Sequence, residues 1–232
     1  MKMHGIDSRA IYSMTSFTEE NYLKIIYKLS TETESEISTN AVAELTQTKA
    51  ASVTDMLRKL SEKQLVTYQK YQGVRLTVLG EKVALNVIRK HRLWEVFLVE
   101  KLKFNWDEVH EIAEQLEHID SERLVHKLDD FLGCPKFDPH GDPIPDAQGR
   151  MPESGYKNLS EIAVNQPVVM MGVAQHSATF LQYLAKIGLH LGVDICVFEI
   201  NDFDKSFTIK IGGKKSFFIS NEVAKNILVK AF

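Results

Sequence analysis

The apolar residues of positions 16–62 recur at helical spacing in three successive segments. Ser16-Phe17-Thr18-Glu19 matches the capping-box pattern, in which a Ser and a Glu side chain satisfy amides at the start of a helix. Two shorter helices should follow, meeting at Gln47-Thr48. The apolar stripes comprise Tyr22, Ile25, Ile26 and Leu29 in the first helix, Ala41, Val42, Ala43 and Leu45 in the second, and Val53, Met56, Leu57 and Leu60 in the third. This pattern predicts a small three-helix core, preceded by a loose arm over residues 1–15.

The third segment carries small and polar residues in its first turns, as the recognition helix of a helix-turn-helix requires. Small side chains let the backbone enter the major groove, while polar groups meet base edges and phosphates. Next, Leu65–Tyr71 and Val74–Thr77 alternate in polarity around Gln72-Gly73, which predicts a hairpin wing. An ordinary three-helix core with a hairpin would show the same pattern. If the unit binds DNA, the residues expected to face the duplex are Thr48, Lys49, Ala51, Ser52, Thr54, Asp55, Lys59, Lys70 and Arg75.

A long helix is predicted from Thr77 to about Lys101, followed by helices over Trp106–His118 and Ser121–Leu132. The apolar residues of the long helix exceed what one small core requires, so we expect part of its surface to be a dimer seam. These residues are Val83, Val87, Leu93, Val96, Phe97 and Leu98. Dimerisation would suit a palindromic DNA site.

Residues 133–155 break the helical pattern. The segment holds five of the six prolines and four of the twelve glycines, which predicts a linker or extended loop. Cys134 and His140 in this segment are metal-ligand types, but the flanking prolines and the lack of a partner pair favour a structural loop.

From Tyr156 onward the pattern changes to short alternating runs interrupted by two helices. The runs are Val168–Val173, Asp194–Ile200, Phe207–Ile211 and Ser216–Ile219, and the helices are Ser177–Ile187 and Asn221–Lys225. This pattern predicts a separate small β-barrel. Nothing in it has the pattern of a catalytic site.

The length of 232 residues allows one large or two to three small domains, each with its own core. Two cysteines do not make a disulfide framework, and the N-terminus lacks the apolar region of a signal peptide. No apolar run approaches the about 20 residues that span a bilayer. We therefore expect a cytoplasmic protein without a membrane anchor.

Charge is unevenly distributed along the chain, although the formal net charge is only −3. Asn40–Arg92 carries ten basic and four acidic residues, a net charge of +6, whereas Leu93–Asp146 carries five basic and fourteen acidic residues, a net charge of −9. A basic block followed by an acidic one fits a phosphate-facing module joined to a cation-binding module.

The acidic block contains two runs of metal-ligand residue types at helical spacing. Residues three or four apart share a helix face, so each run can converge on one divalent metal. A single His–Glu pair at this spacing is commonly only a solvated, salt-bridged face, but two such runs favour metal binding. The first run is His91 and Glu95, and the second is His110, Glu114, Glu117 and His118.

The order of these features resembles the diphtheria toxin repressor family of metal-dependent transcriptional regulators over nearly the whole chain. The resemblance rests on the capped helix, helix-turn-helix and wing, the motifs RKHRLWE and EVHEIAEQLEH, the loop DPHGDPIP, and a barrel containing LQYLAKIGLHLG. It implies a multi-domain, mainly α protein with a C-terminal SH3-like β-barrel. The implied domains are a winged helix-turn-helix at residues 1–76, a helical metal-binding and dimerisation domain at 77–140, a linker at 141–155 and an SH3-like, FeoA-like domain at 156–232.

The resemblance also implies ligands, partners and a role. The partners are a second copy of the chain and a double-stranded, palindromic DNA operator, and the role is repression of metal-uptake genes. The primary metal site would comprise Asn21, Glu114, Glu117 and His118, and the second site His91, Glu95 and His110. For the second site, a loop of the C-terminal domain offers Gln175 and His176 as further ligands.

The first helix departs from the family pattern. Where iron-responsive members have Met and manganese-responsive members usually have Asp, this chain has Asn21. A second carboxylate known in some manganese-responsive members falls at Lys24, which cannot ligate while charged. Glu20 is within reach and could replace or supplement Asn21.

Ligand chemistry favours a hard metal. Where iron sensors have Cys, this chain has Glu114, as manganese sensors do. Carboxylate and amide oxygens suit Mn²⁺, whereas thiolates and thioethers favour softer metals. Mn²⁺ is therefore the expected effector, with Fe²⁺ second and Zn²⁺ third, although Zn²⁺ can bind more tightly in vitro. The metal would clasp the first helix to the fifth and so couple metal binding to DNA binding.

Two alternatives come from other functional classes. Carboxylates and histidines on facing helices also build dinuclear metalloenzymes, but those sites typically use Glu-x-x-His motifs, and no histidine of the two runs has a Glu three residues before it. A metal-buffering or structural dimer without DNA affinity is the other alternative. The family resemblance favours a regulator, not an enzyme.

Overall fold

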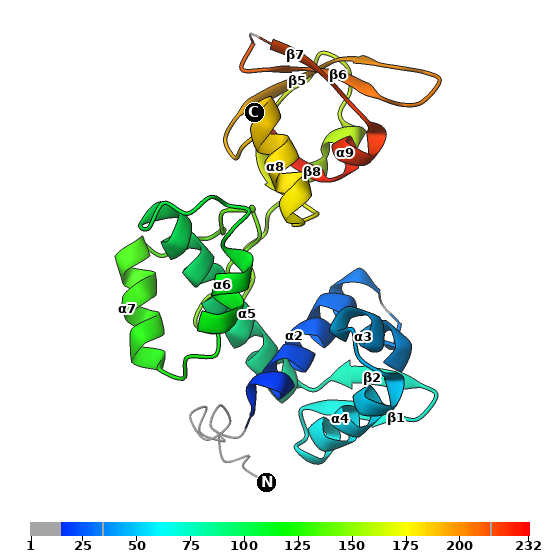
Figure 1. The fold of residues 1–232 in the computed structure, drawn as a ribbon, viewed down its shortest axis with the longest axis vertical. Helices are drawn as coiled ribbons and strands as arrows, with labels where there is room; N and C mark the ends of the chain where they lie inside the picture. Colours follow the sequence, from blue (N-terminus) through cyan, green and yellow to red (C-terminus); the bar gives the residue numbers. More distant parts are fainter. Residues whose placement is uncertain (1–14, 34, 214) are drawn as a thin grey trace. The chain divides into compact units, whose positions relative to one another are not determined.

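The computed structural model describes residues 15–33, 35–213 and 215–232 (Figure 1), so the arm predicted over residues 1–15 lies outside the described residues except for Thr15. The chain divides into two compact units. The first extends to His91 and includes Gln115–His126 and Pro145–Arg150, and the second comprises Arg92–Glu114, Lys127–Ile144 and Met151–Phe232. No helix of the described ranges is long and apolar enough to cross a membrane.

The first unit begins with the three predicted helices and the hairpin, so the winged helix-turn-helix prediction is confirmed. The elements are α2 (Phe17–Glu32), α3 (Thr39–Thr46), α4 (Ala50–Glu62), β1 (Val66–Gln69) and β2 (Gly73–Leu76). Ser16 caps α2 through the predicted capping box: the Glu19 amide donates to Ser16 Oγ, and the Ser16 amide donates to Glu19 Oε2 at 2.7 Å. Gln47, in the left-handed region at φ 51°, ends α3 and turns the chain toward α4.

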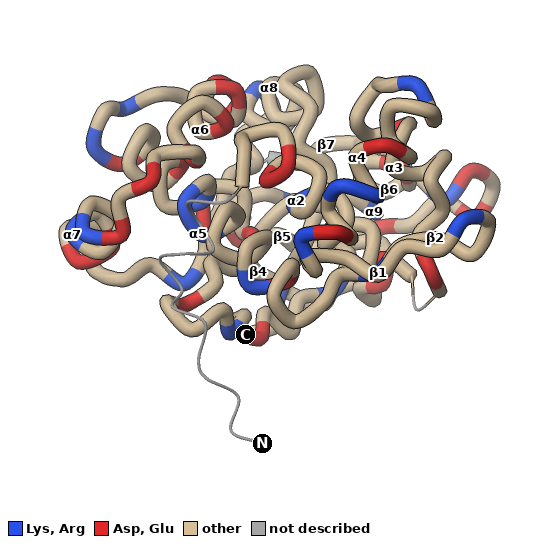
Figure 2. Tube along the Cα trace, turned by 90° about the horizontal axis from the view of Figure 1, so that it is seen from below, with Lys and Arg blue, Asp and Glu red and all other residues tan. Residues whose placement is uncertain are grey.

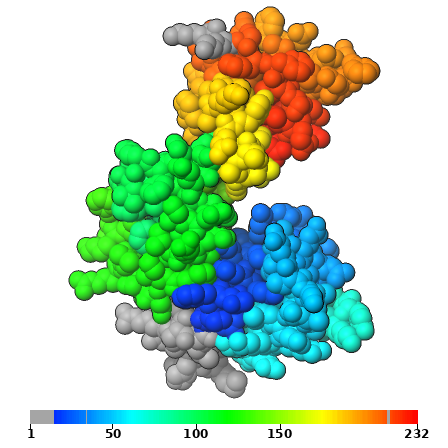
Figure 3. Space-filling model, viewed as in Figure 1, coloured from blue at the N-terminus to red at the C-terminus, as the bar shows by residue number. Residues whose placement is uncertain are grey.

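The apolar stripes of these elements meet in one core, which lies inside the part of the chain coloured blue to cyan in Figure 3. Its fully buried members include Leu23, Ile26, Val42, Val53, Leu57 and Leu60. The antiparallel hairpin pairs Val66 with Leu76 and Gln69 with Gly73. Gly73 has φ 122°, and a Cβ there would lie 2.7 Å from the Ile37 carbonyl oxygen. The wing therefore requires glycine where it returns to the core.

Glu19 is a buried acid that ties α2 to α4. Its carboxylate accepts hydrogen bonds from the Ser16 amide and from Lys63 at 2.8 Å, and it lies 3.1 Å from Lys59 Nζ. Burial alone would raise the pKa of Glu19, but the donors from Lys63, Ser16 and Lys59 outweigh burial and hold it below the usual 4.5.

We expect Glu19→Gln to destabilise the first unit by about 1.5–3 kcal/mol, because the charged acceptor of three donors becomes a neutral amide. Urea unfolding at neutral pH measures this loss. The matched control is Glu62→Gln, at an exposed position of α4, which should leave the midpoint unchanged. Equal midpoints for the two variants would contradict the prediction.

Three helices follow the wing. α5 (Val78–Glu100) confirms the long helix and runs through both units, and α7 (Glu122–Leu132) lies where predicted. α6 (His110–Leu116) is shorter than predicted at both ends, because the Asn105 amide and side chain bond to Glu108 and hold a turn before it. Glu117 and His118 lie in the turn after α6. Figure 2 shows acidic positions recurring along α6 and α7.

Five of the six residues expected at a dimer seam on the long helix are buried within the chain. Val83, Val87, Leu93, Val96 and Leu98 are each at most 3% exposed within a single chain, and Phe97 is partly buried. The five buried residues are therefore not free to contact a second copy, and only Phe97 of the six keeps part of its surface exposed. Exposed apolar side chains following α5 and on α7 are Leu102, Phe104, Leu124 and Phe131.

The C-terminal part of the second unit forms one six-stranded antiparallel sheet in the order β3-β8-β4-β5-β6-β7. Its elements are β3 (Lys157–Asn158), the 3₁₀ turn η1 (Leu159–Glu161), β4 (Pro167–Val173), α8 (Ala178–Ile187), β5 (Asp194–Ile200), β6 (Phe207–Ile211), β7 (Lys215–Ile219), α9 (Asn221–Lys225) and β8 (Ile227–Ala231). The predicted runs are confirmed, and β8 was missed. The predicted closed barrel is not found: within the described ranges the edge strands β3 and β7 do not pair, and β3 is only two residues long.

The proline-rich loop contains no helix, as expected, but part of it is tightly packed. Asp138 and His140 are 4% and 3% exposed. Gly141 has φ 90°, and a Cβ there would lie 2.1 Å from the Met171 carbonyl oxygen. The loop therefore carries two buried ionisable groups against the sheet, which a free linker would not do.

Candidate metal centres and nucleic-acid interface

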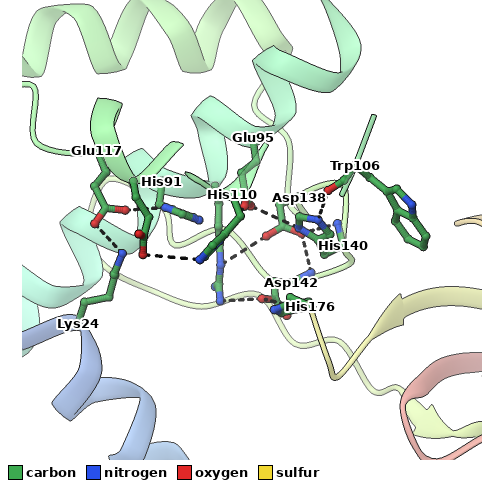
Figure 4. Close-up of polar contacts among 12 residues, drawn as sticks. Lys24, His91, Glu95, Trp106, His110, Glu117, Asp138, His140, Asp142 and His176 are labelled. Atoms are coloured by element: carbon green, nitrogen blue, oxygen red, sulfur yellow. Dashed lines mark hydrogen bonds and ion pairs between the residues drawn. The ribbon is translucent and has the colours of Figure 1, made fainter. Parts of the chain in front are cut away.

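Glu117 is the centre of a group of polar side chains in the first unit, called here the Glu117 cluster and made up of Glu20, Asn21, Lys24, His91, Glu117 and His118. The Glu117 side chain is wholly buried, and both of its oxygens are engaged (Figure 4). Oε2 lies 2.5 Å from His91 Nδ1, and Oε1 accepts a hydrogen bond from Lys24 Nζ at 2.6 Å. The turn after α6 is thereby joined to α2 and to α5.

His118 and Asn21 complete the cluster. His118 Nδ1 lies 2.6 Å from Glu20 Oε2, and His118 Nε2 lies 3.7 Å from Glu117 Oε1. Asn21 Oδ1 is buried and has no hydrogen-bond partner in the described part of the chain. A buried acceptor without a donor is costly, and a bound cation would satisfy it. The oxygen and imidazole donors present thus fit a divalent metal.

Lys24 is the one member of the cluster that opposes metal binding. Burial would raise the pKa of Glu117, but the hydrogen bond from His91 and the charge of Lys24 outweigh burial and lower it. Glu117 is therefore a carboxylate already neutralised by an internal cation. A metal at Glu117 must displace the Lys24 ammonium or share the carboxylate with it.

Glu95 is the centre of a second group, called here the Glu95 cluster and made up of Glu95, His110, Asp138 and His140, all in the second unit. Glu95 Oε1 lies 3.5 Å from His110 Nδ1, and Glu95 Oε2 lies 3.5 Å from His140 Nδ1 (Figure 4). Ligand atoms of Glu95, Asp138 and His140 all lie within 4.8 Å of one another. His140 Nε2 donates to the Trp106 carbonyl at 2.7 Å, so the nitrogen that faces Glu95 is the one left for a metal.

The Glu95 cluster raises the pKa of two of its members, Asp138 and His140. Burial, with the charges of Asp142 and Glu95, raises the pKa of Asp138 to about 7. Burial would lower the pKa of His140, but the hydrogen bond and charge of Glu95, together with Asp138, raise it to about 9. Arg92 Nε lies 3.6 Å from Asp138 Oδ2. The raised pKa of His140 favours its protonated form beside Glu95, and a divalent cation bound there would displace that proton.

Three further predicted ligands, Glu114, His176 and Gln175, lie outside the two clusters. Glu114 is half exposed on α6, with Oε1 3.6 Å from His110 Nε2. His176 Nε2 lies 3.8 Å from Asp142 Oδ2, and its ring centroid lies 5.1 Å from that of His140. Gln175 instead accepts hydrogen bonds from Ser177, the cap of α8.

The structure brings to a candidate centre His140, which the sequence analysis assigned to a structural loop, and Asp138, which it did not consider. Their only signal was the DPHGDPIP motif itself, because the prolines of this loop rule out the helix on which residues four apart would share a face. Their relation to Glu95 arises only when the loop folds against α5.

The predicted DNA-facing residues lie on α4 and the wing. Exposed ones are Lys49, Ala51, Ser52, Asp55, Lys59, Lys70 and Arg75. Thr48 is exposed as well and Thr54 is half-buried, and both hydroxyls bond within the chain: Thr54 donates to the Ala50 carbonyl, and Thr48 Oγ1 lies 2.7 Å from Thr46 Oγ1. Arg58, which was not predicted, is exposed on α4 and pairs with Asp55 at 3.3 Å.

Comparison with known proteins matches three family models in sequence along the chain. They are the iron dependent repressor N-terminal DNA binding domain at residues 14–74, the iron dependent repressor metal binding and dimerisation domain at residues 77–146, and the FeoA domain at residues 157–231.

Individual relatives agree with these matches. The iron-dependent repressor IdeR of Mycobacterium leprae (strain TN) is 30% identical over 161 residues, covering 66% of this chain and 70% of the relative. A solved manganese-dependent transcriptional repressor in complex with manganese is 33% identical and superposes with a TM-score of 0.82, covering 92% of this chain and 100% of the other. The structure of ScaR with bound Zn²⁺ is 34% identical with a TM-score of 0.73, covering 92% and 99%.

Proposed function

Because the chain belongs to the diphtheria toxin repressor family of metal-dependent, DNA-binding transcriptional repressors, we propose that its effector is Mn²⁺, bound at the Glu117 cluster. The main support for this proposal is that buried oxygen and imidazole donors converge around Glu117, next to the unsatisfied oxygen of Asn21. The relatives are repressors, so the protein is a regulator and not an enzyme.

The choice of Mn²⁺ follows from the donor types. Carboxylate and amide oxygens with imidazole form a hard set, and sulfur is absent from both clusters. Fe²⁺ is the alternative effector and Zn²⁺ the third. Solved relatives are described with manganese, zinc and cadmium, which is why affinity alone does not identify the physiological metal.

The second centre in this proposal is the Glu95 cluster. Its support is the pair of histidines that face the two oxygens of Glu95, and the buried Asp138 beside His140. His91 stands one helical turn before Glu95 on α5, so it remains a candidate for this centre as well as a partner of Glu117. Of the two ligands predicted from the C-terminal domain, His176 is the better candidate for this centre, because its ring lies next to that of His140.

Metal at the Glu117 cluster would act as a clasp within the first unit. It would hold α2, part of the DNA-binding core, to the turn after α6. Only tighter binding to the DNA-competent arrangement can shift that equilibrium. A coupling of about 1–3 kcal/mol corresponds to a several-fold to about hundredfold change in operator affinity. In this proposal a homodimer presents two copies of α4 to a palindromic operator in the cytoplasm.

Operator binding measured with Mn²⁺, Fe²⁺, Zn²⁺ and no added metal tests the proposal. Tighter binding with metal than without it, and activation by Mn²⁺ at free concentrations found in cells, is the expected result. Equal affinity in all four conditions would defeat it.

The wing and α4 should contact different parts of the DNA, the wing its phosphates and α4 its base edges. Lys70 is an exposed ammonium at the wing tip, 4.9 Å from the Tyr71 ring centroid, and suits phosphate contact. Lys70→Ala should weaken binding to all DNA sequences alike, whereas Asp55→Asn on α4 should change sequence preference. Binding to a panel of operator variants measures both effects. A Lys70→Ala protein with altered sequence choice would contradict the wing assignment.

A further inference from the structure

A polar pocket of about 170 Å³ lies in the first unit, and none of its lining residues belongs to the Glu117 or the Glu95 cluster. About 10–15 Å³ of the same measure suffices for one water molecule, so the pocket has room for a small polyatomic ion with its hydration. Its charged and polar lining comes from α5, from the two residues before α7 and from α7 itself, and comprises Asn86, Arg89, Lys90, Asp120, Ser121, Glu122 and His126.

Lys90 is the unusual member of this lining. It is only 5% exposed, yet no hydrogen bond or ion pair joins it to any described residue. Its neighbour Arg89, by contrast, donates to the Pro145 carbonyl at 3.3 Å. A cation largely withdrawn from water is stabilised when a neighbouring group supplies negative charge. Something in the pocket must therefore supply negative charge or hydration.

The acidic groups around Lys90 do not meet this need. Glu20, Asp120 and Glu117 act on it electrostatically, but none contacts it. Glu117 is engaged by Lys24 and His91, and Glu20 by His118. The ammonium thus remains available to a ligand.

The first turn of α7 adds a second attraction for an anion. Ser121 caps this 11-residue helix, accepting a hydrogen bond from the Leu124 amide at 3.3 Å. The positive end of a helix dipole favours negative charge, and its free amides are donors. Both this helix end and Lys90 border the same pocket.

We propose that this pocket binds an oxyanion, and specifically hydrogen phosphate. Lys90 and the start of α7 would bind the anionic oxygens. Asp120 also lines the pocket, and a carboxylate accepts hydrogen bonds only. Hydrogen phosphate has a P–OH group to donate to it, whereas sulfate at neutral pH has none. The pocket should therefore bind phosphate more tightly than sulfate.

Calorimetric titration of the metal-free full chain with inorganic phosphate, sulfate and chloride at constant ionic strength tests the site. Saturable binding of one phosphate per chain, at least several-fold tighter than sulfate, is expected. Lys90→Gln should abolish it, and Lys82→Gln, at an exposed position of α5 outside the pocket, should not. No saturable phosphate binding, or equal binding by wild type and Lys90→Gln, would overturn the proposal.

A thermal measurement guards against misfolding of the variant. Because Lys90 is unpaired, Lys90→Met should melt at or above the wild-type temperature in phosphate-free buffer, and phosphate should raise the melting temperature of wild type only. A phosphate-induced rise of equal size in Lys90→Met would place the anion elsewhere and refute the assignment.

One consequence rests on the proposed function. Phosphate beside Lys90 would reduce the positive potential at Glu20 and Glu117, so it should tighten Mn²⁺ binding several-fold in wild type but not in Lys90→Gln. Titration followed by the free Mn²⁺ signal in electron paramagnetic resonance measures this. Unchanged Mn²⁺ affinity would refute the linkage. A chain that binds no Mn²⁺ would instead refute the proposed function, and the metal-free phosphate result would stand.

Discussion

Replacement of Glu117 by Gln should abolish metal-activated operator binding. Glu117 is the wholly buried carboxylate on which Lys24, His91 and His118 converge. The amide keeps the size of the side chain but removes the charge that a divalent cation needs. We expect operator affinity in Mn²⁺ to fall to the metal-free level, a loss of up to about a hundredfold if the coupling lies at the upper end of its usual range.

The same substitution leaves Lys24 and His91 facing a neutral group, so it should also cost stability, about 3–5 kcal/mol for a broken buried pair. Fluorescence anisotropy with and without Mn²⁺ should therefore be read beside circular dichroism at the assay temperature. Glu111→Gln, at an exposed position of α6, is the matched control and should keep the metal response. A folded Glu117→Gln protein with a full response to Mn²⁺ would show that the clasp lies elsewhere.

Replacement of Lys24 by Gln should have the opposite effect and tighten Mn²⁺ binding. Its ammonium lies 2.6 Å from Glu117 Oε1 and occupies a position where a cation would bind. Two unit charges about 4 Å apart interact by about 4 kcal/mol at an effective dielectric constant of 20, and solvent and relaxation reduce this. Removal of the internal cation should lower the Kd for Mn²⁺ by about ten- to a hundredfold, and Lys24→Glu should lower it further.

Direct Mn²⁺ titration measures the effect of Lys24. Lys28→Gln, one turn further along α2 at an exposed position, is the control and should bind Mn²⁺ like wild type. If Lys24→Gln binds Mn²⁺ with the wild-type Kd or more weakly, Lys24 does not compete with the metal and its ion pair with Glu117 only supports the fold.

Local patterns sufficed for most of the secondary structure. The capping box at Ser16 and Glu19 and the runs that became β5 and β6 involve neighbours within a few residues, so short-range sterics and hydrogen bonds decide them. The limits of α6 were less predictable, because a turn at Asn105 competes with the helical pattern. β8 was missed because it directly follows α9 and its pairing with β4 is long-range.

The pattern of apolar residues in the sequence did not predict which surface would cover each apolar face. The apolar face of α5 looked too large for one chain, yet Val83, Val87 and Leu93 are fully covered within it. Periodicity shows that a helix face is apolar but not which surface covers it. For the same reason the alternating C-terminal runs predicted strands correctly but not whether their sheet closes into a barrel.

The sequence by itself determined the family, the helix-turn-helix and wing, and the ligand types at Glu117, His118, Glu95 and His110, because these depend on residue identity and spacing. Only the tertiary structure decided how those groups combine. Lys24 and Glu117 are 93 residues apart in the chain, and no spacing rule predicts that their side chains meet. His140 Nδ1 lies 3.5 Å from Glu95 Oε2, and Lys90 has no hydrogen-bond or ion-pair partner in the described part of the chain. The packing of distant segments sets these distances and this burial, and they in turn set the charge and metal chemistry of the groups.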